Sequence, residues 1–155
     1  MPDPLLSVER AGEILLEHAP QVSETETVAL ADVNGRVLFE DVTSRITQPP
    51  FAASAMDGYA VRAADIGPEG AELQVIGEVA AGAMPNAPVT AGTAMRIFTG
   101  APLPQGADSV VIQENTEKRG DAGVFFKTAA AVGDNIRYAG QDFAAGDILL
   151  SRGRT

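Results

Sequence analysis

Turn-forming residues interrupt the chain beyond residue 58 so often that only short strands fit between them. The intervening runs are rich in β-branched and aromatic residues, and Gly, Pro, Asn and Asp separate them. These runs are Tyr59–Arg62, Leu73–Val79, Met95–Phe98, Ser109–Gln113, Val124–Thr128 and Asn135–Arg137. This spacing predicts a compact β-barrel or β-sandwich. Gly120-Asp121-Ala122-Gly123 is typical of a hairpin loop, since its glycines allow the positive φ angles of tight turns.

The residues before this region predict a helix from Ser7 to His18. Ser7 is a favourable N-cap, and Pro20 ends the helix. Apolar residues recur at helical spacing along it: Val8, Ala11, Ile14 and Leu15. His18 lies where it can interact favourably with the C-terminal end of the helix dipole.

Further segments connect the helix to the β-rich region. The segment Glu26–Leu30 has an alternating pattern that includes β-branched residues, which predicts a strand. The following Asp32-Val33-Asn34-Gly35 is either a turn or the end of a helical turn. The tandem Pro49-Pro50 forbids helix and favours extended chain, so we place a domain boundary nearby. Close to the end of the chain, Asp147–Leu150 predicts a last strand.

Composition narrows the chemistry that the chain can support. Its 155 residues, 45% of them apolar, suffice for one ordinary core or two small ones. The absence of cysteine excludes disulfides, thiolate zinc sites and cysteine nucleophiles, and a single histidine argues against a nitrogen-ligated transition metal. This leaves sites built on oxygen, which suit magnesium or the chemistry of an oxyanion.

Charge and hydropathy indicate where the protein acts. The formal net charge of −10 argues against a nucleic-acid partner, because affinity for phosphate backbones depends on clustered Lys and Arg. No apolar run is long enough to span a membrane, and Met1-Pro2-Asp3-Pro4 lacks the basic stretch of a signal peptide. We therefore expect a cytoplasmic protein with no membrane or nucleic-acid partner.

The first candidate site is Ser54-Ala55-Met56-Asp57-Gly58-Tyr59-Ala60. Its carboxylate sits between small residues and a glycine that lets the backbone approach a ligand closely, which makes Asp57 the first functional candidate. The alternative is structural: Asp57 makes an Asx turn or caps a strand end, and Gly58 supplies a turn dihedral angle. The residues by themselves do not decide between the two.

The second candidate site is Arg96-Ile97-Phe98-Thr99-Gly100-Ala101-Pro102-Leu103-Pro104, a strand that runs into a Gly/Pro-rich turn. The hydroxyl of Thr99 can hydrogen-bond an oxyanion, although threonine beside glycine is also ordinary turn chemistry. Glu114 and Glu117 follow nearby, and we interpret them as a solvated strand face rather than an acid/base pair.

The third candidate site lies within Gly133–Asp142, which brings one guanidinium, glycines and carboxylates into a short segment. Arg137 can bind a phosphate through its planar fork. An exposed salt bridge from Arg137 to Asp134 or Asp142 is an equally good interpretation.

Together these three segments resemble the molybdopterin molybdenumtransferases, the MoeA and gephyrin E-domain family. The N-terminal part of that family reads P-x-F-x-x-S-A-M-D-G-Y-A, then R-I-x-T-G-A-P-x-P-x-G-x-D-x-V-V, then G-x-N-I-R-x-x-G-x-D-x-x-x-G. The corresponding stretches here are Pro49–Val61, Arg96–Val111 and Gly133–Gly146. Each motif is moderately specific, and the resemblance rests on their order and separation along essentially the whole sequence.

This resemblance implies an α+β fold. A discontinuous mixed α/β subdomain, residues 1–45 and 139–155, is expected to hold an inserted, mostly β subdomain of barrel- or sandwich-like form, residues 46–138. Family members continue into a nucleotide-fold domain that binds the pterin and into a C-terminal β domain. They form homodimers in which the β insertion of one subunit faces the pterin-binding domain of the other. The chain is then expected to carry part of a shared site.

The resemblance also implies a reaction. The full-length protein is expected to insert molybdate into the dithiolene of adenylylated molybdopterin with release of AMP, assisted by magnesium. Asp57, Thr99 and Asp142 are the implied catalytic residues: the aspartates position metal or water and are the candidate magnesium ligands, and Thr99 contacts the oxyanion. The implied substrate-binding residues are Ser54, Met56, Gly58, Gly100 and Arg137. Without the pterin-binding domain, the chain alone is expected to be inactive.

Two other functions stay open. The chain is in the first case a noncatalytic dimerisation or assembly module of the same family, since eukaryotic relatives are also scaffolds. In the second it is a small-ligand module unrelated to molybdenum, which requires the order of the motifs to be chance. We expect the natural protein to continue beyond Thr155, and continuation into a nucleotide-binding domain favours the enzyme.

Overall fold

The structure is a computed structural model that describes residues 5–20 and 22–155. Its residues group into two compact units. The first contains the residues up to Glu40 together with Arg152–Thr155, and the second contains Asp41–Ser151. The subdomain joints expected at residues 46 and 138 stay a prediction.

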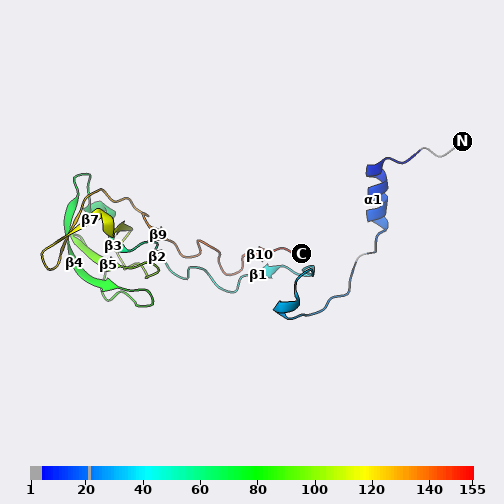
Figure 1. The fold of residues 1–155 in the computed structure, drawn as a ribbon, viewed down its shortest axis with the longest axis horizontal. Helices are drawn as coiled ribbons and strands as arrows, with labels where there is room; N and C mark the ends of the chain where they lie inside the picture. The colour runs from blue at the N-terminus through cyan, green and yellow to red at the C-terminus, as the bar shows by residue number, and fades with distance from the viewer. Residues whose placement is uncertain (1–4, 21) are drawn as a thin grey trace. The chain divides into compact units, whose positions relative to one another are not determined.

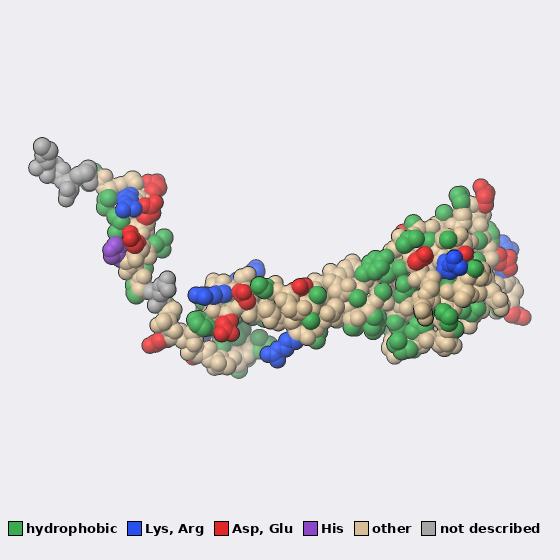
Figure 2. All heavy atoms as spheres, turned by 180° about the vertical axis from the view of Figure 1, so that it is seen from behind, with side chains coloured by type: hydrophobic (Ala, Val, Ile, Leu, Met, Phe, Trp, Pro, Cys, Tyr) green, Lys and Arg blue, Asp and Glu red, His purple; other side chains and the backbone are tan. Residues whose placement is uncertain are grey.

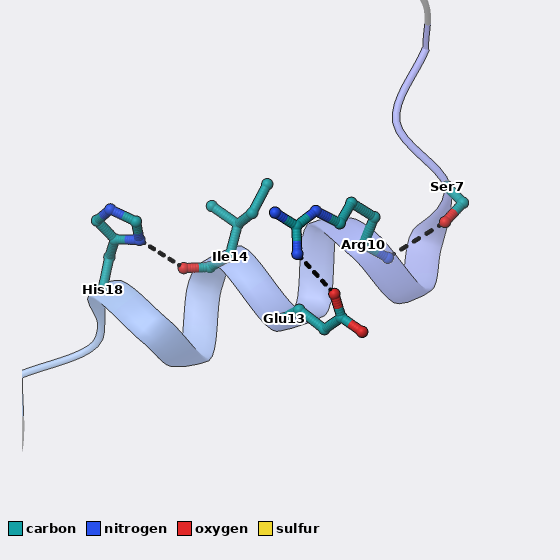
Figure 3. Close-up of polar contacts among 5 residues, drawn as sticks. All are labelled: Ser7, Arg10, Glu13, Ile14 and His18. Atoms are coloured by element: carbon teal, nitrogen blue, oxygen red, sulfur yellow. Dashed lines mark hydrogen bonds and ion pairs between the residues drawn. The ribbon is translucent and has the colours of Figure 1, made fainter.

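The first unit contains helix α1, Val8–His18, the predicted helix. Figure 3 shows both of its ends. The hydroxyl of Ser7 accepts a hydrogen bond from the Arg10 backbone N–H at 3.2 Å, and Nδ1 of His18 lies 2.9 Å from the carbonyl oxygen of Ile14. The N-cap and the C-terminal histidine are thus confirmed in the roles that the sequence predicts.

Helix α1 buries none of its side chains. The large apolar side chains exposed on it and just before it are Leu5, Leu6, Val8, Leu15 and Leu16. An isolated helix of this length is marginally stable in water, because most helical stability in proteins comes from packing an apolar face. Contacts within the first unit do not supply that packing.

The predicted strand at Glu26–Leu30 is wrong. This segment has an irregular backbone and leads into a short 3₁₀ helix, η1, Leu30–Asp32, which a turn at Asn34-Gly35 follows. Both interpretations of the residues after Asp32 therefore hold in part. Among the described residues no strand pairs with Glu26–Leu30, and a strand depends on partners for its backbone N–H and C=O groups.

The second unit is built on a six-stranded sheet with the order β6-β3-β5-β4-β8-β7 (Figure 1). Its strands are β3 Gly58–Val61, β4 Ala71–Val79, β5 Thr93–Ile97, β6 Ser109–Ile112, β7 Thr116–Arg119 and β8 Gly123–Phe126. Neighbouring strands are antiparallel except β4 and β5, which are parallel. The sheet curls, but its edge strands β6 and β7 do not pair, so it forms an open half-barrel rather than a closed barrel. The predicted hairpin between β7 and β8 is confirmed.

Apolar side chains cover both faces of this sheet. In β3, Tyr59 and Val61 belong to one buried cluster, whereas Ala60 between them belongs to another. Val111 and Val110 of β6 divide in the same way. Because successive side chains of a strand point to opposite faces, the two clusters lie on opposite sides of the sheet. Burial on both faces explains why the strands read as continuous apolar runs rather than alternating ones.

Two extended segments lead away from this sheet and run side by side (Figure 1). β2, Ala53–Ser54, pairs antiparallel with β9, Ile136–Arg137, and β1, Val42–Thr43, pairs antiparallel with β10, Ile148–Leu150. The β2–β9 pairing places the first and third sequence motifs next to each other. The structure is therefore mostly β, with one α-helix among the described residues.

The charged side chains on the surface do not form a basic patch on the face that Figure 2 shows, in agreement with the acidic composition. On the face drawn in Figure 2, Lys and Arg side chains are scattered among Asp and Glu rather than gathered into a basic patch. Of the helices that the structure describes, none is long and apolar enough to cross a membrane.

Candidate functional site

Asp57 and Thr99 meet at one end of two neighbouring strands. Asp57 directly precedes β3 and Thr99 follows β5, and the register pairs Gly58 with Ile97. The backbone N–H and the hydroxyl of Thr99 both donate to Oδ1 of Asp57, each at 2.8 Å. No described residue donates a hydrogen bond to the other carboxylate oxygen, Oδ2. The carboxylate is thus fixed at one oxygen, and both residues are exposed.

These hydrogen bonds stabilise the charged form of Asp57. The backbone N–H of Thr99 has the largest effect and lowers the pKa of the Asp57 carboxyl below its ordinary value, and the Thr99 hydroxyl lowers it further. Desolvation opposes this shift in the pKa, and the positive charge of Arg96 adds to it. Asp57 is therefore a carboxylate at neutral pH, and it accepts protons or hydrogen bonds rather than donating them.

Ser54 shapes the turn that leads to Asp57. Its hydroxyl is buried and donates to the carbonyl oxygen of Met56 at 2.6 Å, so it is engaged within its own turn. Its carbonyl oxygen accepts the Gly100 backbone N–H at 2.8 Å. Gly100 has a φ of +82°, in the left-handed region that favours glycine. The turns after Ser54 and after Thr99 are therefore joined directly, with Met56 exposed beside Asp57.

Gly58 is needed by the packing of the sheet. It is buried in β3, and a Cβ atom there would lie 2.0 Å from the carbonyl oxygen of Val111 in β6. Gly58 lies in a β-strand and is not among the glycines with a positive φ angle. It therefore does not supply the turn dihedral angle that was the structural alternative for this residue. The contact of Gly58 with substrate stays a prediction.

Arg137 and Asp142 form a second pair. Nη2 of Arg137 lies 2.7 Å from each carboxylate oxygen of Asp142, and both side chains are exposed. The salt bridge considered from the sequence therefore exists, with Asp142 rather than Asp134 as the partner. Within the described part of the chain no hydrogen bond or ion pair joins this pair to Asp57 and Thr99. Phosphate binding by Arg137 stays a prediction.

No complete metal site forms around Asp57 or Asp142 among the described residues. In the described ranges no three Asp, Glu, His or Cys side chains gather in a way that could hold a metal ion. Asp142 is paired with Arg137, and Asp57 offers one oxygen beyond the one that Thr99 holds. The described residues thus do not form a magnesium site by themselves.

Two residues that the sequence did not single out are connected to Asp57. The backbone N–H of Gln113 donates to the carbonyl oxygen of Asp57 at 3.1 Å, and the side-chain oxygen of Gln113 accepts from Nη2 of Arg96 at 2.7 Å. A sequence signal for Arg96 exists. It is a charged residue between the buried Met95 and Ile97 of a strand that is covered on both faces.

Comparisons with known proteins agree with the sequence motifs. A family model described as the MoeA N-terminal region (domain I and II) matches residues 6–155. A molybdopterin molybdenumtransferase of Haemophilus influenzae is 36% identical over 149 residues, which cover 96% of the chain and 37% of that protein. One from Nostoc sp. is 38% identical over 154 residues, covering 95% of the chain and 35% of that protein.

A solved structure shows the same fold. The molybdopterin biosynthesis moeA protein from Pyrococcus horikoshii OT3 is 37% identical and superposes with a TM-score of 0.87, covering 97% of this chain and 40% of that one. The chain thus spans well under half the length of the relatives that it matches. It belongs to the MoeA family of molybdopterin molybdenumtransferases, of which it carries the N-terminal region.

Proposed function

We propose that this chain supplies part of the active site of an enzyme of molybdenum cofactor biosynthesis, which inserts molybdate into adenylylated molybdopterin with release of AMP. The observation that carries the proposal is the contact of Asp57 with Thr99, which stabilises the charged carboxylate and leaves Oδ2 open. The names of the relatives support the class of reaction.

The proposed role of Asp57 follows from the proton balance of the insertion. When the two thiols of a dithiolene replace one oxygen of molybdate, both thiol protons leave with that oxygen as water. Release of AMP is a separate step, in which water attacks the phosphoanhydride bond and AMP is the leaving group. A fixed carboxylate can accept a proton from a thiol and pass it to the departing oxygen. A carboxylate held charged repels molybdate itself, so Asp57 acts on these protons or on water rather than as a direct ligand of the anion.

The roles of the other two catalytic candidates are limited by their present partners. The hydroxyl hydrogen of Thr99 is donated to Asp57, so a direct hydrogen bond from Thr99 to an oxyanion requires that bond to break. Both oxygens of Asp142 face Arg137, so Asp142 and a bound phosphate compete for the same guanidinium. We propose that Thr99 acts mainly through Asp57, and that substrate binding opens the Arg137–Asp142 pair.

The division into subdomains belongs to the same proposal. Residues 1–45 and 139–155 form the discontinuous α/β subdomain, and residues 46–138 form the β-rich insertion. The antiparallel pairing of β1 with β10 supports this, because it joins the chain before the insertion to the chain after it. The chain spans 37% of the Haemophilus influenzae protein, so we propose that the rest of the site lies in the remaining sequence and that the chain alone is inactive.

A noncatalytic assembly module is the second candidate function. The observation that favours it is the apolar surface of α1, which has no partner within its own unit. A second copy of the chain is the kind of partner that can bury such apolar side chains. This candidate predicts association without any dependence of a reaction on Asp57.

The test is a complementation assay that measures AMP release. The chain is mixed with the separately expressed remainder of a molybdopterin molybdenumtransferase, adenylylated molybdopterin, molybdate and magnesium. We expect AMP release from the mixture, its loss with Asp57→Ala, and no loss with Asp121→Ala, which removes an exposed carboxylate from the β7–β8 turn. Parts that associate but release no AMP, or release that Asp57→Ala leaves unchanged, would contradict the proposal and favour the assembly module.

A further inference from the structure

Arg96 is held between several groups of the sheet. Its Nη1 donates to the carbonyl oxygen of Gly58 at 2.9 Å, and its Nη2 donates to the side-chain oxygen of Gln113 at 2.7 Å. Its guanidinium carbon lies 5.2 Å from the ring centre of Tyr59 and 4.7 Å from that of Phe98. A planar guanidinium satisfies both requirements at once, because its edge carries the donors and its face contacts aromatic rings.

Both acceptors of Arg96 belong to residues that are joined directly to Asp57. Gly58 is the next residue in the chain, and Gln113 donates its own backbone N–H to the carbonyl oxygen of Asp57 at 3.1 Å. Arg96 therefore bridges the residue that follows Asp57 and Gln113, which binds Asp57 from the 3₁₀ helix η3, Gln113–Asn115, directly after β6. Thr99 lies three positions after Arg96 in the chain, and the Arg96 guanidinium contacts the ring of Phe98, the residue directly before Thr99.

We propose that Arg96 is a positioning residue of the site, which holds the backbone of Asp57 at the end of β3 so that its carboxylate meets both donors of Thr99. The inference rests on the proposed function for its catalytic meaning, but its structural content is independent of it. The fork geometry is the essential property. A lysine ammonium keeps the charge but cannot hold two acceptors in one plane and contact two rings at the same time.

A purely structural arginine in this sheet offers the matched control. Arg119 on β7 also lies over an aromatic ring, with its guanidinium carbon 5.4 Å from the ring centre of Phe125, and it also donates to a side chain, Glu117, at 3.2 Å. β7 is the edge strand at the opposite end of the sheet order from β6. Replacing Arg119 thus removes similar contacts far from Asp57 in that order.

The test uses the 155-residue chain and two NMR signals of Thr99, its amide proton shift and its amide exchange rate. A charge-assisted hydrogen bond moves the amide proton downfield and protects it from exchange. In Arg96→Gln and in Arg96→Lys we expect the shift to move upfield and exchange to speed up about tenfold beyond any change at the core amide of Val124. Arg119→Gln and Arg119→Lys are expected to leave both signals unchanged.

A third variant, Gln113→Ala, keeps the guanidinium and its ring contacts but removes one acceptor. We expect a smaller upfield shift of the Thr99 amide proton and a smaller increase in its exchange rate than in Arg96→Lys. This variant still tests the positioning role if Arg96→Gln does not fold. Unchanged Thr99 signals in Arg96→Lys and Gln113→Ala would overturn the proposal. Equal acceleration at Thr99 and Val124 would also overturn it, because that is the pattern of a residue that stabilises only the fold.

The complementation assay separates this inference from the proposed function. If the Thr99 amide loses its hydrogen bond to Asp57 in Arg96→Lys and AMP production also falls, the positioning role of Arg96 and the catalytic role of Asp57 are both supported. If Thr99 is released but AMP production is unaffected, Arg96 still positions Asp57, and the catalytic role of Asp57 is wrong. If AMP production falls while the Thr99 signals stay as in the wild type, Arg96 acts by another route and the positioning role is wrong.

Discussion

Thr99 gives both of its hydrogen-bond donors to a single oxygen of Asp57, although the two residues are 42 positions apart in the sequence. They meet because β3 and β5 are adjacent and antiparallel, with Gly58 opposite Ile97. The contact is therefore a product of the sheet and not of a local turn. It fixes one carboxylate oxygen and leaves the other available for chemistry.

Removal of the Thr99 hydroxyl should change the titration of Asp57 in part. In Thr99→Val the backbone N–H, which lowers the pKa of Asp57 most, is retained, so we expect the pKa to rise but to stay below the ordinary aspartate value. Thr99→Ser keeps both donors and should leave the pKa as in the wild type. Carboxyl carbon shifts followed by NMR over a pH series measure this, and a full return to the ordinary pKa in Thr99→Val would contradict the ranking of the two donors.

The same contact predicts a pH dependence of stability. Because folding lowers the pKa of Asp57, its contribution is present above the pKa of the unfolded chain and is lost as the pH falls through the lowered pKa of the folded state. Asp57→Asn has no such group. The wild type should therefore be stabilised relative to Asp57→Asn near neutral pH, and this advantage should shrink on acidification. Urea unfolding at a series of pH values tests this, and a constant difference between the two proteins would count against it.

Gly58→Ala should destabilise the sheet. The new Cβ would lie 2.0 Å from the carbonyl oxygen of Val111, so β3 and β6 must move apart. We expect a loss of about 1–3 kcal/mol in the free energy of unfolding, typical of overpacked sites. Gly67→Ala is the control, because nothing lies within 4 Å of the Cβ position there. Equal stability of the two variants in urea unfolding would show that the β3–β6 contact is looser than described.

Phe126, in the core, should contribute more to the free energy of unfolding than its partly exposed neighbour Phe125. Phe126 is fully buried and meets Tyr59 edge-to-face with ring centres 5.8 Å apart. Phe126→Ala should cost about 3–5 kcal/mol of unfolding free energy through lost burial and the cavity left behind. Phe125→Ala, on the partly exposed face of the same strand, should cost clearly less. Urea or thermal unfolding of both variants tests the assignment of faces.

The Arg137–Asp142 pair should contribute little to stability. Its side chains are 45% and 41% exposed, and exposed ion pairs contribute about 0–1 kcal/mol. A double-mutant cycle with Arg137→Ala and Asp142→Ala should therefore give a coupling energy below about 1 kcal/mol. A much larger coupling energy would mean that the pair is held for structural reasons, which would weaken the proposal that substrate opens it.

Much of the fold could be predicted because its signals are local. The N-cap at Ser7 and the apolar spacing after it predict α1, and β-branched runs between turn residues predict the strands of the sheet to within one or two residues at each end. The prediction of a strand at Glu26–Leu30 is wrong because an alternating pattern also occurs in irregular chain. A strand forms only where another strand pairs with it through backbone hydrogen bonds.

Long-range relations account for what the sequence did not reveal. The two-residue strands β1 and β2 carry too little pattern to be recognised, and they form because β10 and β9 lie beside them. For the site, the motifs pointed to Asp57 and Thr99 separately, but their direct contact follows from the β3–β5 register. The role of Arg96 depends on acceptors in two other segments, at Gly58 and Gln113, which no local pattern places.

The central claim is that the charge of Asp57, held in place by Thr99, takes part in molybdate insertion. Its most direct test is the rate of AMP release in the complementation mixture with Asp57→Asn, after NMR has shown that the Thr99 amide still donates to the new side chain. Asparagine retains an oxygen acceptor but cannot take up a proton, so we predict that AMP release is lost while the Thr99 contact persists. AMP release at the wild-type rate from Asp57→Asn would contradict the claim.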